Sequence, residues 1–151
     1  MASRINEPIL ISACLAGINC TYKGKNKLKP SIKKMVDDGI AIPVCPEVMG
    51  GLGIPRENSE IVDGDGMDVL KRRARVMTIS GKDVTEIYIK AAKAVLAIAR
   101  IYSVRKAILK SKSPACGAGR IYDGSFTKKL KNGSGVTASL LCQKGVKVYS
   151  A

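Results

Sequence analysis

The sequence contains no histidine among its 151 residues. This absence excludes catalysis by Ser-His-Asp triads and Cys-His pairs, and it also excludes zinc sites with mixed cysteine and histidine ligands. The five cysteines form no CxxC pair, so the spacing typical of zinc ribbons and thioredoxin-like redox centres is missing too. Any chemistry carried by the cysteines must therefore come from cysteines that are distant in the sequence.

Long apolar runs are also missing. The most apolar helical candidate, AAKAVLAIARI at residues 91–101, is interrupted by charge, so we expect no membrane span and no membrane partner. The N-terminus, MASRINEPIL, lacks the apolar stretch and small-residue cleavage site of a signal peptide, which predicts a cytoplasmic protein. An odd number of cysteines in such a protein does not favour a disulfide framework.

Aromatic residues are scarce, at 4% of the sequence, whereas positive charge is plentiful. The scarcity of aromatics predicts an aliphatic core and argues against an extended platform for stacking bases. The 26 Lys and Arg residues against 12 Asp and Glu residues give a net charge of +14, concentrated in YKGKNKLKPSIKK (22–34) and KRRAR (71–75). Such a field attracts anions, including nucleotides and RNA, but a lysine-rich solvated surface has the same composition.

Short apolar runs alternate with helical patterns along the chain. We predict four buried strands at residues 8–15, 40–45, 106–110 and 146–150. We predict helices at 29–39, 85–104 (capped by Thr85 or Asp83) and 135–145, a loop at 46–68, and extended chain with a turn at Gly81 over 74–85. The pattern indicates a single three-layer α/β domain at residues 8–151, with a mostly parallel sheet and helices on both faces, after an N-terminal extension of residues 1–7.

Three cysteines share one place in this predicted fold. Cys14 ends the first strand, Cys45 ends the second, and Cys116 follows the third by a few residues. Because the carboxyl ends of parallel strands meet at one edge of a sheet, we expect the three thiols to converge. Thiolates without histidine favour an iron–sulfur cluster or zinc, and three ligands on a four-iron cluster leave one iron open for catalysis. Each cysteine taken alone is better explained as a buried free thiol, and only the three together favour a metal site.

The two other cysteines have weaker signals. Cys20 follows Cys14 by six residues, and we favour a spare thiol near the site over a fourth ligand. Cys142 lies in VTASLLCQKG, on the apolar face of the last predicted helix, so we expect it in the core.

Four segments resemble the family of thiouracil desulfidases (TudS-like proteins, long catalogued as a domain of unknown function). They are SACLAGINCTYKG (12–24), PVCPEVMGGLGIPRENSEIV (43–62), SPACGAGRIYDGSF (113–126) and GVTASLL (135–141), and the resemblance covers about residues 8–150. It implies a 4Fe–4S cluster bound by three cysteines only, at Cys14, Cys45 and Cys116, with Glu47 and Ser113 as catalytic residues. The chain departs from the family pattern at Ala115, where a second serine is usual.

The activity that this resemblance implies is a non-redox desulfuration. Thiocarbonyl becomes carbonyl in thiouracil, thiouridine or its nucleotide, and sulfide is released. Glu47 would take a proton from the attacking water, and Ser113 would hydrogen-bond the substrate or the water. Without the resemblance, Glu47 has the pattern of a surface carboxylate after a turn, and Ser113 that of ordinary turn chemistry.

Loop residues beyond the strand ends are candidates for substrate binding. They are Asn19, Tyr22, Lys23, Arg56, Arg120, Asp123 and Ser125. The cations among them would meet a phosphate if the substrate is a nucleotide. Two alternatives stay open: a zinc-dependent hydrolase on the same three thiolates, and a basic RNA-binding module with structural cysteines. The sequence does not set the oligomeric state.

Overall fold

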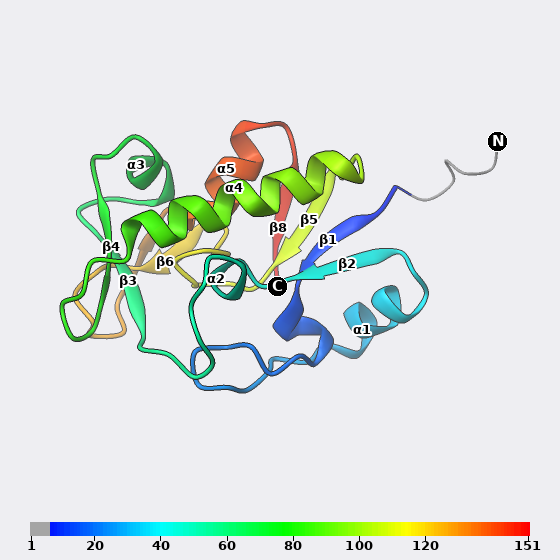
Figure 1. The fold of residues 1–151 in the computed structure, drawn as a ribbon, viewed down its shortest axis with the longest axis horizontal. Coiled ribbons are helices and arrows are strands. Elements are labelled where there is room, and N and C mark those ends of the chain that lie inside the picture. The colour runs from blue at the N-terminus through cyan, green and yellow to red at the C-terminus, as the bar shows by residue number, and fades with distance from the viewer. Residues whose placement is uncertain (1–6) are drawn as a thin grey trace.

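The four predicted strands form one parallel sheet in a computed structural model, which describes residues 7–151. Its strand order is β2-β1-β5-β8 (Figure 1). The strands are β1 (Ile9–Ser12), β2 (Ala41–Val44), β5 (Lys106–Leu109) and β8 (Lys147–Ser150). Of the predicted N-terminal extension, residues 1–6 lie outside the described residues, and Glu7 is exposed.

Helices cover both faces of the sheet, as predicted (Figure 1). They are α1 (Pro30–Asp37) on one face and α4 (Thr85–Ile101) and α5 (Val136–Gln143) on the other. The alternation of strand side chains separates the two layers: Ile11 packs into the core on the α1 side, whereas Leu10 and Leu109 pack into the core under α4 and α5. No helix within residues 7–151 combines the length and apolarity needed to cross a membrane.

The chain reverses its winding direction between β1 and β5. The connection through α1 leads from β1 to β2, and the chain then returns across β1 to β5 on its other side. In open α/β sheets, ligands bind beyond the carboxyl ends of the strands at this switch point. The segment after β1 and the segment after β5 therefore border the expected binding crevice.

The predicted loop at 46–68 is wrong in part, because it contains regular structure. The missed elements are α2 (Pro46–Met49), β3 (Ser59–Val62) and α3 (Gly66–Leu70). β3 pairs antiparallel with β4 (Arg75–Thr78), which lies in the segment predicted as extended, and the chain turns after it at Gly81. The helices α2 and α3 are shorter than two helical turns, and β3 (SEIV) is not a continuous apolar run like the strands of the parallel sheet, so the hydrophobic pattern did not indicate them.

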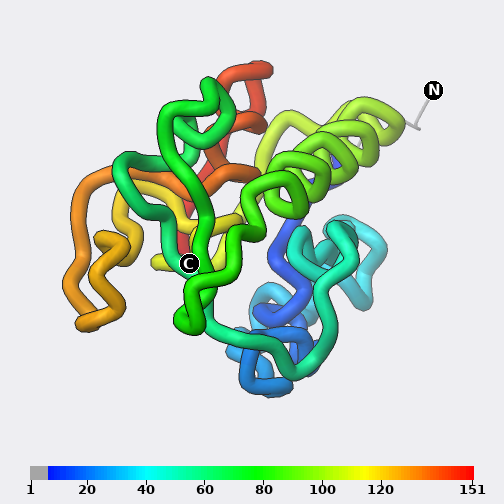
Figure 2. Tube along the Cα trace, turned by 60° about the vertical axis from the view of Figure 1, so that its left-hand side comes forward, coloured from blue at the N-terminus to red at the C-terminus, as the bar shows by residue number. Residues whose placement is uncertain are grey.

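The glycine-rich segment after β5 also contains strands that the sequence pattern did not indicate. β6 (Arg120–Tyr122) and β7 (Leu130–Asn132) form an antiparallel pair. Figure 2 shows this yellow-to-orange hairpin beside the green segments of β3 and β4. The Glu60 carboxylate of β3 ties them together, because it accepts the N–H groups of Gly124 and Phe126.

The N-cap prediction for the long helix is also corrected. Val84 occupies the N-cap position of α4, rather than Thr85 or Asp83. Asp83 nevertheless stabilises this helix start, since its carboxylate accepts the N–H of Thr85 at 2.9 Å.

Gly50 allows α2 to lie directly against α4. A Cβ atom at Gly50 would come within 2.8 Å of the Ile87 carbonyl oxygen and 3.0 Å of the Ala91 Cβ atom. Only glycine fits between these atoms, and the close approach places the first turn of α2, with Glu47, beside α4.

We predict that Gly50→Ala lowers the free energy of unfolding by about 1–3 kcal/mol, because the added methyl group meets α4 backbone that cannot move aside. Denaturant unfolding measures the change. Gly53→Ala is the matched control, since the nearest atom to its added Cβ is 3.8 Å away, and it should stay within about 0.5 kcal/mol of wild type. Equal stability of the two variants would contradict the close approach.

Candidate functional site

The cysteines named from the sequence sit at the carboxyl ends of three adjacent strands. Cys14 lies in the short 3-10 helix η2 (Ala13–Ala16) directly after β1, Cys45 is the N-cap of α2 directly after β2, and Cys116 lies in the turn that follows β5. Cys14 and Cys116 are buried, and Cys45 is half-buried. Each thiol is near enough to the others for their charges to interact.

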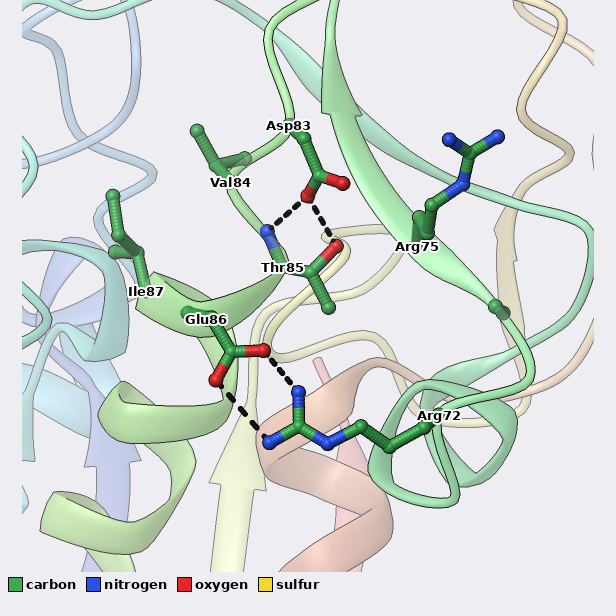
Figure 3. Close-up of a pocket in the computed structure, with 8 residues that line it drawn as sticks. Arg72, Arg75, Asp83, Val84, Thr85, Glu86 and Ile87 are labelled. Carbon is green, nitrogen blue, oxygen red and sulfur yellow. Dashed lines mark hydrogen bonds and ion pairs between the residues drawn. The ribbon is translucent and has the colours of Figure 1, made fainter.

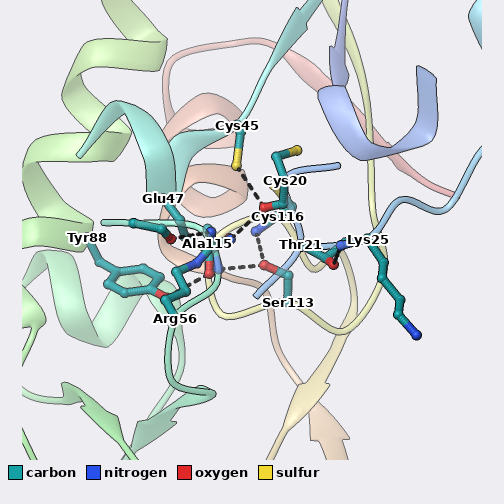
Figure 4. Close-up of polar contacts among 11 residues, drawn as sticks. Cys20, Thr21, Lys25, Cys45, Glu47, Arg56, Tyr88, Ser113, Ala115 and Cys116 are labelled. Atoms are coloured by element: carbon teal, nitrogen blue, oxygen red, sulfur yellow. Dashed lines mark hydrogen bonds and ion pairs between the residues drawn. The ribbon is translucent and has the colours of Figure 1, made fainter. Parts of the chain in front are cut away.

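Cys20 is a fourth thiol at the same place, and it is buried rather than exposed. It hydrogen-bonds to Cys14 on one side and Cys45 on the other. The Cys45 thiol also donates to the Cys20 carbonyl oxygen over 3.7 Å (Figure 4). Cys14, Cys20, Cys45 and Cys116 together are called the cysteine site below.

Burial and mutual contact hold most of these thiols in the neutral form. Burial raises the pKa of the Cys116 thiol to about 12. The hydrogen bond with Cys14 raises the pKa of Cys20 to about 11, and the hydrogen bond with Cys20 raises the pKa of Cys45 far above its usual value. The hydrogen bond between Cys14 and Cys20 lowers the pKa of Cys14. Binding of a metal centre would therefore release protons from this site.

The chemistry of this donor set fits an iron–sulfur cluster. Within residues 7–151, no group of three or more cysteine, aspartate or glutamate side chains is arranged to hold a single metal ion. A four-iron cluster makes a different demand, because each cysteine binds its own iron and the sulfurs stand around a cube rather than a point. Neighbouring thiols from several loops, without histidine, are the ligands that such clusters use.

Glu47 projects from the first turn of α2 and is clamped by two donors (Figure 4). The Tyr88 hydroxyl of α4 donates to its Oε2 atom at 2.7 Å, and the Arg56 guanidinium lies 3.4 Å from its Oε1 atom. The side chain of Glu47 is 15% exposed. Its charge raises the pKa values of Cys45 and Cys116, which places the carboxylate beside the cysteine site.

Arg56 is part of this site and points inward. Its side chain is 8% exposed. The guanidinium donates to the carbonyl oxygens of Gly53 and Cys20 at 3.1 and 2.9 Å, in addition to its ion pair with Glu47. Its Nε atom is buried and has no hydrogen-bond partner among residues 7–151. Arg56 thus fastens the Cys20 segment to α2, while most of its donors are already occupied.

Ser113 shapes the turn that carries Cys116. Its Oγ atom accepts the N–H groups of Ala115 and Cys116, both at 3.0 Å (Figure 4). Because both of these bonds use the oxygen as acceptor, the hydroxyl proton stays available for a further partner. Ala115, where the resembling family usually has serine, is fully buried, and the turn is closed without a hydroxyl at that position.

Two further polar residues reach the cysteine site. Ser12 is buried at the end of β1, accepts the N–H of Lys110 at 2.9 Å and hydrogen-bonds the Cys116 thiol. Lys110 follows β5 and is half-buried; burial lowers the pKa of its ammonium group, and the charges of Cys14 and Cys116 oppose this shift. Lys110 ends the predicted strand 106–110, so the rule that located the cysteines could have indicated it. Ser12 lies inside the predicted strand 8–15 and comes to its end only because β1 stops at Ser12.

Apart from Arg56, the candidate substrate-binding residues fall into two groups. Asn19, Tyr22 and Lys23 are exposed on the segment after Cys14, which is tied back to the site because the Arg56 N–H donates to the Tyr22 carbonyl oxygen. The second group consists of Arg120, Asp123 and Ser125 on the β6–β7 hairpin. Within that hairpin, the Asp123 carboxylate accepts both the N–H and the hydroxyl of Ser125.

The prediction of a core position for Cys142 is wrong. This cysteine is exposed in the last turn of α5. All six residues from Val136 to Leu141 are buried, so the helix has no single apolar face from which the side of Cys142 could be inferred.

A cavity of about 370 Å³ lies elsewhere, at the start of α4 (Figure 3). Several of the charged side chains that line this cavity are already paired with other lining residues. Arg72 forms an ion pair with Glu86, and Asp83 accepts hydrogen bonds from Thr85. No member of the cysteine site lines it, so we place the candidate active site at the cysteines.

Fold and site together define the class: an α/β protein with a thiol-rich site and a clamped carboxylate at the carboxyl edge of its parallel sheet. The sequence model of the 2-thiouracil desulfurase family matches residues 9–151. The chain therefore belongs to the 2-thiouracil desulfurase family, and the resemblance inferred from its motifs is confirmed.

One relative and one solved structure extend this comparison. The uncharacterized protein YbbK of Bacillus subtilis (strain 168) is 48% identical over 142 residues, which cover 94% of each chain. A solved structure of the [4Fe-4S]-dependent thiouracil desulfidase TudS is 37% identical, with a TM-score of 0.84 over 96% of this chain and 91% of that one. The match confirms the three-layer α/β fold.

We predict that Cys142 is alkylated at least about tenfold faster than Cys14, Cys20 and Cys116 in the native protein, because Cys142 is exposed and the other three thiols are buried away from the reagent. Peptide mass spectrometry after brief iodoacetamide treatment measures the rates. Denatured protein is the control, since all five cysteines should then react. Equal native rates would contradict the burial of the cysteine site.

Proposed function

We propose that this protein is a desulfidase that replaces sulfur by oxygen in thiouracil, thiouridine or its nucleotide, using a 4Fe–4S cluster bound by Cys14, Cys45 and Cys116. One observation carries the proposal: three strand ends bring these thiols together beside a clamped carboxylate. Family membership and the likeness to a [4Fe-4S]-dependent thiouracil desulfidase support it. We further propose a cytoplasmic location, where thiols are kept reduced.

Three of the four thiols at the cysteine site would hold the cluster, and Cys20 would remain auxiliary beside them. A cluster with three cysteine ligands supplies an open iron, which acts as a thiophilic Lewis acid toward the C=S sulfur. Lys110 places a cation next to Cys14 and Cys116, which would offset part of the negative charge that thiolates bring into a buried site.

The overall reaction exchanges one water molecule for one hydrogen sulfide, released as hydrosulfide and a proton, without net oxidation or reduction. The water oxygen forms the new bond to the ring carbon, the carbon–sulfur bond breaks with its electron pair leaving on sulfur, and protons move from water to sulfur or a ring nitrogen. The Glu47 carboxylate, beside Cys45 and Cys116, would accept the proton from water and pass it on. The Ser113 hydroxyl would donate its free proton to the substrate or the water.

Substrate recognition would use the segment after Cys14, with Asn19, Tyr22 and Lys23, together with Arg120, Asp123 and Ser125 of the hairpin. The exposed Lys23 and Arg120 are the candidates for contacting a phosphate, since the Arg56 guanidinium is paired inside the site. A substrate series of thiouracil, thiouridine, its monophosphate and thiolated RNA, each assayed for sulfide release, tests which form is used. RNA binding with steep salt dependence and no sulfide release would favour a binding module instead.

We predict that Cys45→Ala removes both the cluster and the turnover, because it deletes one of three proposed ligands. Anaerobic reconstitution followed by iron, sulfide and zinc analysis measures the first, and sulfide release measures the second. Cys142→Ala, the same change at an exposed cysteine, is the control and should retain both. Zinc in place of iron, or full turnover by Cys45→Ala, would overturn the proposal.

Glu47→Gln should retain the cluster and lose turnover by about 10²–10⁴-fold, the usual contribution of a positioned proton acceptor. Glu57→Gln is the control for the same change at an exposed carboxylate. Full turnover by Glu47→Gln would remove Glu47 from the mechanism, whatever the fate of the cluster.

A further inference from the structure

We propose that Tyr88 is a positioning residue for desulfuration: its phenol holds the Glu47 carboxylate in the orientation needed for proton transfer. This inference rests on the function proposed above. The sequence pattern assigned Tyr88 only to a helix, and the two residues are 41 positions apart, so their contact arises from the fold alone.

The hydrogen bond has the geometry of a strong, fixed contact. The Tyr88 hydroxyl lies 2.7 Å from Glu47 Oε2, within the range for a charge-assisted bond. Tyr88 is 1% exposed and sits among the core residues of α4, so the phenol cannot turn to water instead. Burial raises the pKa of this phenol well above its usual value, and the Glu47 charge adds to the shift, so the hydroxyl remains a donor.

Two contacts fix the carboxylate, and the phenol supplies the one that is a hydrogen bond. Glu47 belongs to a helix of only four residues, and within residues 7–151 the phenol makes the one hydrogen bond that its carboxylate accepts. The Arg56 guanidinium forms an ion pair with the other oxygen at 3.4 Å, which is longer than the 2.7 Å hydrogen bond from the phenol. The two carboxylate oxygens thus face donors from different parts of the chain (Figure 4), and loss of the phenol would leave the carboxylate held by the Arg56 ion pair alone, with nothing else in the described part of the chain to fix Oε2.

A proton acceptor works only when its accepting oxygen is oriented toward the proton it removes, and a displacement of about 1 Å can cost about 10²-fold in rate. Removal of the Tyr88 hydroxyl should therefore reduce kcat by about 10- to 100-fold without changing how substrate or cluster binds. A role confined to fastening α2 to α4 would instead loosen the segment that carries Cys45 and reduce the iron content.

Tyr88→Phe tests this with little change of volume. In the anaerobically reconstituted holoenzyme we expect kcat to fall about 10- to 100-fold, while KM and iron per chain stay within about twofold of wild type. A crystal structure of the variant should show the Glu47 carboxylate moved from its wild-type position. Tyr102→Phe, the same change at a 55% exposed residue at the other end of α4, is the control and should leave kcat unchanged.

An unchanged kcat in Tyr88→Phe, or a loss of kcat that follows a loss of iron or a rise in KM, overturns the inference. Failure of the proposed function has a different signature, because wild-type holoenzyme would then release no sulfide from any member of the substrate series. In that case the crystal structures decide alone: a Glu47 carboxylate that stays in place without the phenol overturns the positioning role.

Discussion

The parallel pairing of β2, β1 and β5 is the constraint on which the rest of this site depends. Three segments that are separated by some 30 and 70 residues in the sequence meet only because the three strands end at one edge. The hydrogen bond from the Lys110 N–H to the Ser12 hydroxyl continues the β1–β5 pairing past the last ladder residue. Because Ser12 also contacts the Cys116 thiol, the register of the sheet is transmitted directly to the cysteine site.

The segment from β2 to α2 shows how local sequence converts this constraint into geometry. β2 is an edge strand, so Pro43 can occupy it without removing a hydrogen bond from the interior of the sheet. Cys45 is the single residue between strand and helix, and Pro46 begins α2 at a position where its missing N–H is not needed. Glu47 then lies in the first turn, and Gly50 permits the contact with α4 that brings Tyr88 to it.

The parts that could be predicted from sequence were those with a long or repeated signal. The apolar runs of the four strands and the seventeen-residue α4 were indicated by pattern, and the convergence of Cys14, Cys45 and Cys116 followed from strand direction alone. Short elements such as α2 and β6 contain too few residues to show a helical or strand hydrophobic pattern. Tyr88 could not be assigned a role because its partner comes from an element that the pattern did not reveal, and the exposure of Cys142 depends on how α5 is covered.

Charge explains why the buried polar residues at the site come as a set. Once the thiols lose their protons to bind a metal centre, thiolates and a carboxylate in one largely buried place repel one another. Unpaired buried charge is costly. Arg56 lies against Glu47, and Lys110 lies near Cys14 and Cys116, so the carboxylate and two of the thiols have a cation within reach. The contacts of Glu47 with Tyr88 and Arg56 therefore offset the charge of the carboxylate and keep it largely away from solvent. Because the Arg56 guanidinium is already paired with Glu47, Lys110 at the end of β5 is the cation that stands beside Cys14 and Cys116.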